Sequence, residues 1–276
     1  MAGVLDGKSA IVTGSARGIG RATAELLAEQ GAQVLINDLD GDVAEQAAGE
    51  IGGETAVFAG DLTADGVPDQ LVQKAVDEFG KIDIIVNNAG YTWDGPIHKM
   101  ADDQFQAMLD IHVAVPFRVL RAAAPHLREP AKKEREEGRE VFRKVVNISS
   151  VSGTMGNAGQ ANYSSGKSGV VGLTKTLAKE WGQFKINVNA VAFGFVETRL
   201  TAAKEEAGTF QKEGKEIQLG IPEQLRQMAS MIIPLGRPAT PEEAAGGVFF
   251  LCSPWSNYVH GQVLNVTGGQ FSGMYT

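Results

Sequence analysis

The chain has 276 residues, of which 43% are hydrophobic and 21% charged, and its formal net charge is -8 at pH 7. This composition is typical of a soluble globular protein, and the negative charge argues against nucleic acid and anionic membranes as partners. The single cysteine, Cys252, excludes an internal disulfide and suits a reducing compartment. The sequence shows neither a signal-peptide pattern nor an apolar run near the ~18 residues that span a bilayer, so we expect a cytoplasmic protein.

Short apolar segments alternate with longer segments of helical periodicity along the whole chain. β-branched and apolar runs predict seven strands, at residues 10–13, 33–37, 55–59, 82–87, 144–149, 186–192 and 262–266. Between most of them, apolar residues recur at helical spacing, as in residues 19–30. This alternation predicts a single α/β domain over residues 1–276, a Rossmann-type doubly wound parallel sheet of seven strands flanked by helices.

Two segments depart from this regular alternation. Residues 128–144 hold seven basic and five acidic residues with Pro130 and Gly138, which predicts a charged surface extension between a helix and a strand. Residues 199–233 are polar and then rich in methionine, and they follow the carboxyl end of a predicted strand. Because such strand ends face the ligand crevice, this segment is a candidate substrate lid, with ordinary surface packing as the alternative.

A glycine-rich turn follows the first predicted strand, in the sequence Thr13-Gly-Ser-Ala-Arg-Gly-Ile-Gly20. Gly14 permits a tight turn, Gly18 lets the backbone approach a phosphate, and Gly20 lets the next helix pack against the sheet. The N-terminus of that helix adds unpaired N–H groups and the positive end of the helix dipole, which favour a pyrophosphate. The position of the motif between a strand and a helix therefore predicts a dinucleotide-binding site.

The second predicted strand leads into Asp38, twenty residues after Gly18. A carboxylate at this point accepts hydrogen bonds from both ribose hydroxyls of an adenosine, and it repels a 2′-phosphate. Arg17 favours the opposite choice, because a guanidinium pairs well with that phosphate. Repulsion between a carboxylate and a 2′-phosphate dianion costs more binding free energy than pairing with an exposed arginine contributes. We therefore expect NAD as the cofactor, with NADP less favoured.

Tyr163 and Lys167 are four residues apart, and Ser150 precedes the tyrosine by thirteen residues. Four residues make about one helical turn, so we expect the phenol and the ammonium on one helix face. The ammonium favours the phenolate, which predicts that the Tyr163 pKa falls from about 10 toward neutrality and that Tyr163 exchanges a proton with a substrate oxygen. Ser150 ends a predicted strand and is placed to hydrogen-bond the same oxygen. The alternative for the tyrosine–lysine pair alone is an exposed polar helix face.

Metal binding is not indicated by the sequence. The four histidines, His98, His112, His126 and His260, show no spacing typical of metal ligands. Residues 38–42 resemble the start of a calcium loop, but the glycine comes too early and no glutamate closes a loop of the required length. We therefore predict no metal site.

With these motifs in order, the chain resembles the short-chain dehydrogenase/reductase family over essentially its whole length. The matching landmarks are the glycine turn, Asp61, Asn87-Asn-Ala-Gly90, Ser150, Tyr163-x-x-x-Lys167, residues 194–198 and residues 265–269. Within the family, residues 153–163 and 194–198 look very like the 3-oxoacyl-(acyl-carrier-protein) reductases.

The resemblance implies a role for each matching residue. Tyr163 is expected to be the general acid/base, with Lys167 tuning it and holding the nicotinamide ribose, and with Ser150 orienting the substrate oxygen. The adenine amine is expected at Asp61 and the carboxamide at Val196. The whole expected cofactor site comprises Gly14, Ser15, Arg17, Gly18, Ile19, Gly20, Asp38, Asp61, Leu62, Asn88, Ala89, Gly90, Tyr163, Lys167, Val196 and Thr198.

Two departures from the family pattern lie near the expected reaction centre. His112 stands where the family has a catalytic asparagine, whose backbone carbonyl holds a water of the proton relay. His112 either preserves this relay through its own carbonyl, as a fourth catalytic residue, or only fills the helix. Phe193-Gly194 replaces the usual Pro-Gly that precedes the carboxamide contact.

A third departure concerns the partner. Two basic positions with which carrier-protein reductases dock their acidic partner fall on Val141 and Phe184, with Arg143 and Lys185 nearby as possible replacements. Together with the net charge and Asp38, this weakens the assignment to acyl carrier protein. Coenzyme A is therefore an alternative carrier of the acyl group.

The leading interpretation is an NAD(H)-dependent oxidoreductase that interconverts a secondary alcohol and a ketone in a 3-oxoacyl or 3-hydroxyacyl thioester. One alternative keeps this chemistry with a steroid, cyclic alcohol or polyol as substrate. A remote alternative is a cofactor-binding regulator without turnover. The resemblance also implies a homotetramer.

Overall fold

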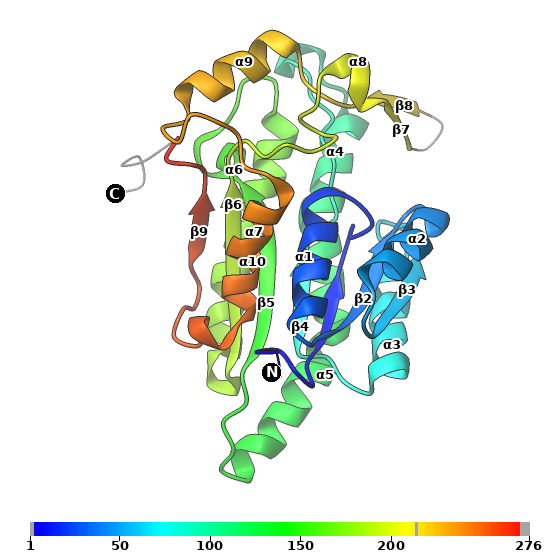
Figure 1. The fold of residues 1–276 in the computed structure, drawn as a ribbon, viewed down its shortest axis with the longest axis vertical. Coiled ribbons are helices and arrows are strands. Elements are labelled where there is room, and N and C mark those ends of the chain that lie inside the picture. Colours follow the sequence, from blue (N-terminus) through cyan, green and yellow to red (C-terminus); the bar gives the residue numbers. More distant parts are fainter. Residues whose placement is uncertain (1–2, 213–214, 271–276) are drawn as a thin grey trace.

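A computed structural model describes residues 3–212 and 215–270 of the chain (Figure 1). Seven strands form one parallel sheet in the order β3-β2-β1-β4-β5-β6-β9. They are β1 (Ser9–Val12), β2 (Gln33–Asp38), β3 (Thr55–Ala59), β4 (Ile84–Asn87), β5 (Arg143–Ser150), β6 (Ile186–Phe193) and β9 (Val263–Val266). All seven predicted strands are present with small shifts at their ends, and the predicted Rossmann-type architecture is confirmed.

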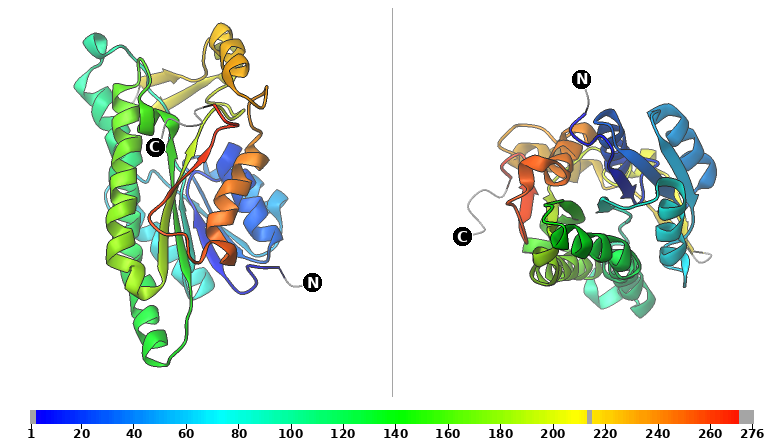
Figure 2. Two further views of the ribbon diagram at one scale, coloured as in Figure 1. Left: turned by 90° about the vertical axis from the view of Figure 1, so that its left-hand side faces the viewer. Right: turned by 90° about the horizontal axis from the view of Figure 1, so that it is seen from below.

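Helices connect the strands and cover both faces of the sheet (Figure 2). The longer ones are α1 (Gly18–Glu29), α2 (Gly41–Ile51), α3 (Val67–Phe79), α4 (Asp102–Leu109), α5 (Val115–Glu136), α7 (Ala161–Trp181), α9 (Glu223–Ile232) and α10 (Pro241–Cys252). The shorter ones are α6 (Val151–Met155) and α8 (Lys204–Ala207), and a π-helical segment, Asp110–Ala114, joins α4 to α5.

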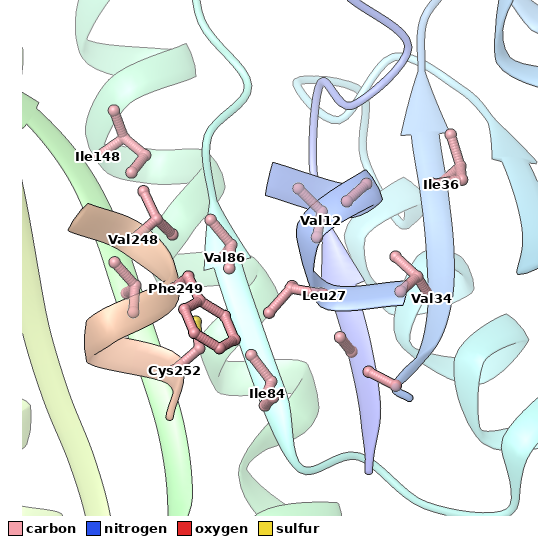
Figure 3. Packing of buried hydrophobic residues seen from close by; sticks show 14 of the residues in the cluster. Val12, Leu27, Val34, Ile36, Ile84, Val86, Ile148, Val248, Phe249 and Cys252 are labelled. Atoms are coloured by element: carbon pink, nitrogen blue, oxygen red, sulfur yellow. The ribbon is translucent and has the colours of Figure 1, made fainter. Parts of the chain in front are cut away.

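Alternate residues of each strand enter two separate hydrophobic cores. On β2, Val34 and Ile36 belong to a core shared with α1, α2 and α10, and Figure 3 shows Leu27 of α1 between Val34 and Phe249 of α10. The intervening Leu35 packs on the opposite face with α3, α5 and α7. Because successive side chains of a strand point to opposite faces, a strand that is apolar throughout requires cover on both sides.

Residues 199–233 fold above the carboxyl edge of the sheet (Figure 1). They contain α8, a two-stranded antiparallel hairpin of β7 (Thr209–Lys212) and β8 (Lys215–Gln218), and α9. Ile217 of β8 is 3% exposed and belongs to the same hydrophobic core as Leu35, whereas Met231 of α9 is 76% exposed. This segment is therefore anchored at its hairpin and carries an uncovered apolar helix.

The charged segment 128–144 differs from the predicted surface extension. Residues 128–136 continue α5 through Pro130, and Arg143 and Lys144 begin β5 as buried residues. Arg143 donates two hydrogen bonds to the Glu134 carboxylate at 2.7 and 2.8 Å, which compensates for the burial of both charges. A count of charges along the sequence does not show that two of them pair with each other in the interior.

Within the described ranges, none of the helices combines the length and apolar character that crossing a bilayer requires.

Two adjacent glycines of α10 provide a matched test of its packing against β9. A Cβ at Gly247 would lie 2.7 Å from Val266 Cγ2, whereas a Cβ at Gly246 would meet no atom within 4 Å. We expect Gly247→Ala to lower the free energy of unfolding by ~1–3 kcal/mol through overpacking. Gly246→Ala should raise it by ~0.5–1 kcal/mol, because alanine has the higher helix propensity. Urea unfolding of both variants measures this, and equal changes in the two would contradict the packing.

Candidate functional site

The glycine turn between β1 and α1 adopts a conformation that side chains would block. Gly14 and Gly18 have positive φ angles of 60° and 55°. A Cβ on Gly14 would lie 2.8 Å from the Ala89 Cα, and one on Gly20 would lie 2.2 Å from the Gly14 carbonyl oxygen. The three glycines thus serve two requirements, namely left-handed backbone at Gly14 and Gly18 and close approach of neighbouring backbone at Gly14 and Gly20.

Residues that follow β4 hold this turn from the other side. The Asn88 side chain donates to the backbone carbonyls of Thr13 and Gly14, both at 2.9 Å. The backbone N–H groups of Asn88 and Ala89 both donate to the Thr13 hydroxyl at 2.9 Å. The residues 88–90 that the resemblance assigns to the cofactor site therefore also brace the glycine turn.

A cavity opens at the carboxyl ends of β1, β2, β3 and β4. Twelve of the predicted cofactor residues line it: Gly14, Arg17, Gly18, Ile19, Gly20, Asp38, Asp61, Leu62, Asn88, Ala89, Gly90 and Thr198. The cavity combines a backbone cradle at the glycine turn with a carboxylate at Asp38, which are the groups that hold a pyrophosphate and a ribose diol. The residues present therefore fit a dinucleotide.

Four of the predicted cofactor residues, Ser15, Tyr163, Lys167 and Val196, lie outside the cavity wall. Ser15 is fully buried and its hydroxyl donates to the Val12 carbonyl at 2.7 Å, while Val196 bridges to Ala239. The wall also contains residues that were not predicted to contact the cofactor: Asn37, Leu39, Gly60, Thr63, Tyr91, Ile111, Arg199, Leu200 and Leu219. The last three belong to the predicted lid, and several of the others follow predicted strands.

Asp38 and Arg17 have different surroundings at the mouth of this cavity. Asp38 Oδ2 accepts from the Ala16 N–H at 3.3 Å, and its Oδ1 accepts from the Leu39 N–H at 2.9 Å. Arg17 Nη2 lies 3.2 Å from Asp40 Oδ2, in an exposed ion pair. The carboxylate of Asp38 is therefore fixed by backbone donors, whereas the guanidinium of Arg17 is engaged by a neighbouring acid.

Ser150, Tyr163 and Lys167 converge as the sequence predicts. Ser150 ends β5 and caps α6, and Tyr163 and Lys167 lie one turn apart on α7. Lys167 Nζ donates to the Ile148 carbonyl at 2.7 Å and lies 5.7 Å from the centre of the Tyr163 ring. Helix α6 approaches α7 at Gly153, where a Cβ would lie only 2.6 Å from the Lys167 Cβ. Sheet and helix together bring the hydroxyl, phenol and amine into one place.

The predicted shift of the Tyr163 pKa is wrong. Although Tyr163 is only partly buried as a whole residue, burial raises the pKa of its phenol to about 12, and a hydrogen bond with Ser150 opposes this rise only in part. Burial also lowers the pKa of Lys167 to about 7. Desolvation penalises the charged form of both groups, so it outweighs the attraction that the sequence argument considered alone.

His112 lies beside Tyr163 in the π-helical segment. The two rings meet edge to face with centroids 5.0 Å apart, and His112 Nε2 lies 2.9 Å from the Tyr91 carbonyl oxygen. Because a carbonyl only accepts, this nitrogen carries the proton, and Nδ1 is a buried acceptor without a hydrogen-bond partner among the described residues. Burial and the nearby Lys167 hold the His112 pKa well below its usual value, so the imidazole is neutral.

Two glycines provide the space for the imidazole. A Cβ on Gly90 would lie 2.4 Å from His112 Cε1, and one on Gly166 would lie 3.0 Å from His112 Cβ. Gly90 lines the dinucleotide cavity and Gly166 lies on α7 between Tyr163 and Lys167. The ring of His112 thus connects the wall of the cavity to the helix that carries the tyrosine.

The burial of Lys167 predicts a pH dependence of stability. Between pH ~7 and ~10.5 the unfolded lysine binds a proton that the folded one has lost, so unfolding becomes less favourable as the pH rises. Relative to Lys167→Met, the wild-type protein should gain stability from pH 7 to 9.5, by at most ~1.4 kcal/mol per pH unit. Urea unfolding of both proteins across this range measures the difference, and a constant difference would show that the ammonium is not destabilised by burial.

Comparisons with known proteins agree with this geometry. A family model described as Enoyl-(Acyl carrier protein) reductase matches residues 14–270. The 3-oxoacyl-(acyl-carrier-protein) reductase FabG of Thermotoga maritima is 36% identical over 269 residues, 96% of this chain and 98% of that protein. The enzyme of the same name from Aquifex aeolicus is 38% identical over 271 residues, 97% and 98% of the two chains. The crystal structure of 3-ketoacyl-(acyl-carrier-protein) reductase from Brucella melitensis complexed with NADH is similar, with a TM-score of 0.81 and 31% sequence identity. The match covers 96% of this chain and 99% of that one. The chain therefore belongs to the short-chain dehydrogenase/reductase family of oxidoreductases.

Proposed function

We propose that the protein uses NADH to reduce 3-oxoacyl thioesters to 3-hydroxyacyl thioesters, and NAD for the reverse reaction. The observation that carries this proposal is the convergence of Ser150, Tyr163 and Lys167 beside a dinucleotide cavity. Relatives named as 3-oxoacyl-(acyl-carrier-protein) reductases, which align with almost the whole chain, support the substrate class.

The residues of this chain supply the proton and hold the substrate oxygen. A nicotinamide cofactor held in the cavity would supply the hydride for the carbonyl carbon. The Tyr163 O–H bond breaks and its proton passes to the carbonyl oxygen, while the Ser150 hydroxyl hydrogen-bonds the same oxygen. With its pKa at about 12, Tyr163 is fully protonated at neutral pH and ready to act as an acid. The phenolate that remains is stabilised by Lys167 in its charged form.

The surroundings of Asp38 support NAD rather than NADP. Its carboxylate lines the cavity and is fixed by the backbone N–H groups of Ala16 and Leu39. A ribose diol donates hydrogen bonds to such a carboxylate, whereas a 2′-phosphate placed there faces a like charge.

The segment 199–233 acts in this proposal as a lid over cofactor and substrate. Arg199, Leu200 and Leu219 line the dinucleotide cavity, so the anchored part of the segment covers the cofactor. Four exposed apolar side chains follow helical spacing on and just after α9: Met228, Met231, Ile232 and Leu235. Helix α9 lies above the carboxyl edge of the sheet (Figure 1), and its exposed apolar side chains suit an apolar acyl chain.

Two basic residues bear on whether the acyl group is carried by an acidic protein or by coenzyme A. Arg143, named above as a possible replacement in docking an acidic partner, is buried and held by Glu134, so that expectation is corrected. Lys185 is exposed but pairs with Glu140 at 2.7 Å. Since neither cation is free on the surface, the proposal covers coenzyme A thioesters as well as carrier-bound substrates.

A homotetramer is part of the proposal. Phe117 on α5 is 46% exposed and Trp255, after α10, is 67% exposed, and neither lines the cavity. Large exposed aromatic side chains are typical of surfaces that are covered by another subunit.

A substrate panel tests the proposed function. We expect NADH to be oxidised with acetoacetyl-CoA and with carrier-bound 3-oxoacyl groups, and more slowly with free cyclic ketones. Tyr163→Phe should retain cofactor binding while kcat falls by ~10²–10⁴-fold, because the proton donor is lost. Turnover of cyclic ketones or polyols without thioesters would favour the alternative substrates. Tight cofactor binding with no turnover on any substrate would favour a regulator.

His112 provides a separate test of the reaction centre. If its ring positions Tyr163, His112→Ala should lower kcat by about tenfold, the size of an edge-to-face contact of ~0.5–1.5 kcal/mol, with a smaller effect on KM for the cofactor. His112→Asn, which retains an amide donor for the Tyr91 carbonyl, should recover only part of this loss. Unchanged kcat in both variants would show that only the backbone carbonyl of residue 112 contributes.

A further inference from the structure

Arg17 and Arg199 are the two cations among the described residues that line the cavity, and Arg17 belongs to the glycine turn whose Ala16 N–H binds Asp38. It precedes α1 in extended conformation, and its guanidinium is 43% exposed in an ion pair with Asp40, which lies outside the cavity wall. Arginine beside a ribose site is well suited to a 2′-phosphate, because a guanidinium forms charge-assisted hydrogen bonds with phosphate oxygens. The structure thus contains a phosphate-binding side chain next to a carboxylate that repels phosphate.

Asp40 uses its two carboxylate oxygens for different purposes. Oδ1 accepts from the Val43 N–H at 3.3 Å and caps α2, while Oδ2 lies 3.2 Å from Arg17 Nη2. The cap and the arginine together lower the Asp40 pKa, with the backbone hydrogen bond of Val43 as the larger cause. The carboxylate is therefore ionised at neutral pH and held in place by the helix that it caps. It is positioned to hold Arg17 regardless of what the cavity contains.

We propose that Asp40 is a second determinant of cofactor choice, which prevents Arg17 from binding a 2′-phosphate. Asp38 repels the phosphate directly, and Asp40 neutralises the arginine that would otherwise attract it. This inference rests on the preference for NAD in the proposed function, and it assigns Asp40 as a positioning residue that acts through Arg17. It also explains why an arginine in the glycine turn is compatible with that preference.

The proposal predicts that replacing Asp38 alone gives only part of a change in cofactor preference. In an Asp38→Asn protein the direct repulsion is gone, but Arg17 remains paired with Asp40. Adding Asp40→Asn releases the guanidinium, while the asparagine oxygen still caps α2, since asparagine is as good an N-cap as aspartate. NADPH should then bind about fivefold more tightly, as expected for the release of one exposed charge-assisted contact. NADH binding should change by less than about twofold, because its ribose carries no phosphate for Arg17 to bind.

The experiment measures the Kd of NADPH and of NADH by titration of protein fluorescence, in the full chain. The four proteins of the cycle are Asp38→Asn and Asp38→Asn/Asp40→Asn, each with and without Arg17→Gln. Asp42→Asn in the Asp38→Asn background is the matched control, because Asp42 is an exposed acid in the first turn of the same helix and makes no contact with Arg17 in the structure. Circular dichroism checks that α2 and the fold are retained in each variant.

The expected result is a gain for NADPH that requires both Asp40→Asn and Arg17 and that is absent in the Asp42→Asn control. A gain that persists with Arg17→Gln, an equal gain from Asp42→Asn, or an equal gain for NADH would each overturn the proposal. No gain at all in the folded double variant would overturn it too. The proposed preference for NAD has a separate test, and it is wrong if the wild-type protein binds NADPH more tightly than NADH.

Discussion

The parallel order of the sheet is the constraint on which the site depends. Because all strands run in one direction, the glycine turn after β1, Asp38 at the end of β2 and Ser150 at the end of β5 meet at one edge. A shift of one residue in the register of β5 would exchange its two faces and turn the Ile148 carbonyl away from Lys167. The hydrophobic cores on both faces resist such a shift, so packing far from the cavity maintains the position of the catalytic groups.

Burial of Tyr163 and Lys167 gives the site its electrostatic character. Neither charged form is favoured in the protein without ligand, since desolvation raises the pKa of the phenol to about 12 and lowers that of the amine to about 7. Burial removes both ionisable groups from water, which destabilises their charged forms. The attraction between a phenolate and an ammonium is stronger in a medium of low polarity, and it offsets this desolvation when both charges are present. A pair of this kind favours proton transfer to a substrate more than it favours a resting ion pair.

Local patterns were sufficient to predict the sheet, the glycine turn and Asp38, whereas the remaining cofactor residues were implied by the family resemblance. The strands of this protein are apolar on both faces, and the glycine turn requires its residue types for steric reasons that hold in any context. The spacing of Tyr163 and Lys167 was likewise enough to place them on one helix face. These features depend on neighbours in sequence, so the sequence alone specifies them.

The features that the sequence did not reveal depend on contacts between distant segments. Burial of Arg143 requires Glu134 on the preceding helix, and Leu219 reaches the cavity wall because the segment 199–233 folds above the carboxyl edge of the sheet. The pKa of Tyr163 depends on how much protein surrounds it, which no spacing of residues reports. Arg17 and Asp40 are twenty-three residues apart, and their pairing follows from the parallel pairing of β1 with β2, which brings the turns after the two strands together.

The same dependence on distant contacts explains how the chain accommodates histidine at position 112. An imidazole is larger than the amide of an asparagine, and it fits here because Gly90 and Gly166 leave room on two sides of the ring. Its hydrogen bond to the Tyr91 carbonyl fixes the ring between the cavity wall and α7, where its edge-to-face contact reaches Tyr163. A group that binds at Gly90 therefore touches a wall whose other side supports the proton donor. Through this ring, the residues that hold the dinucleotide and the residue that moves the proton form one packed unit, so a change at either glycine is transmitted to Tyr163.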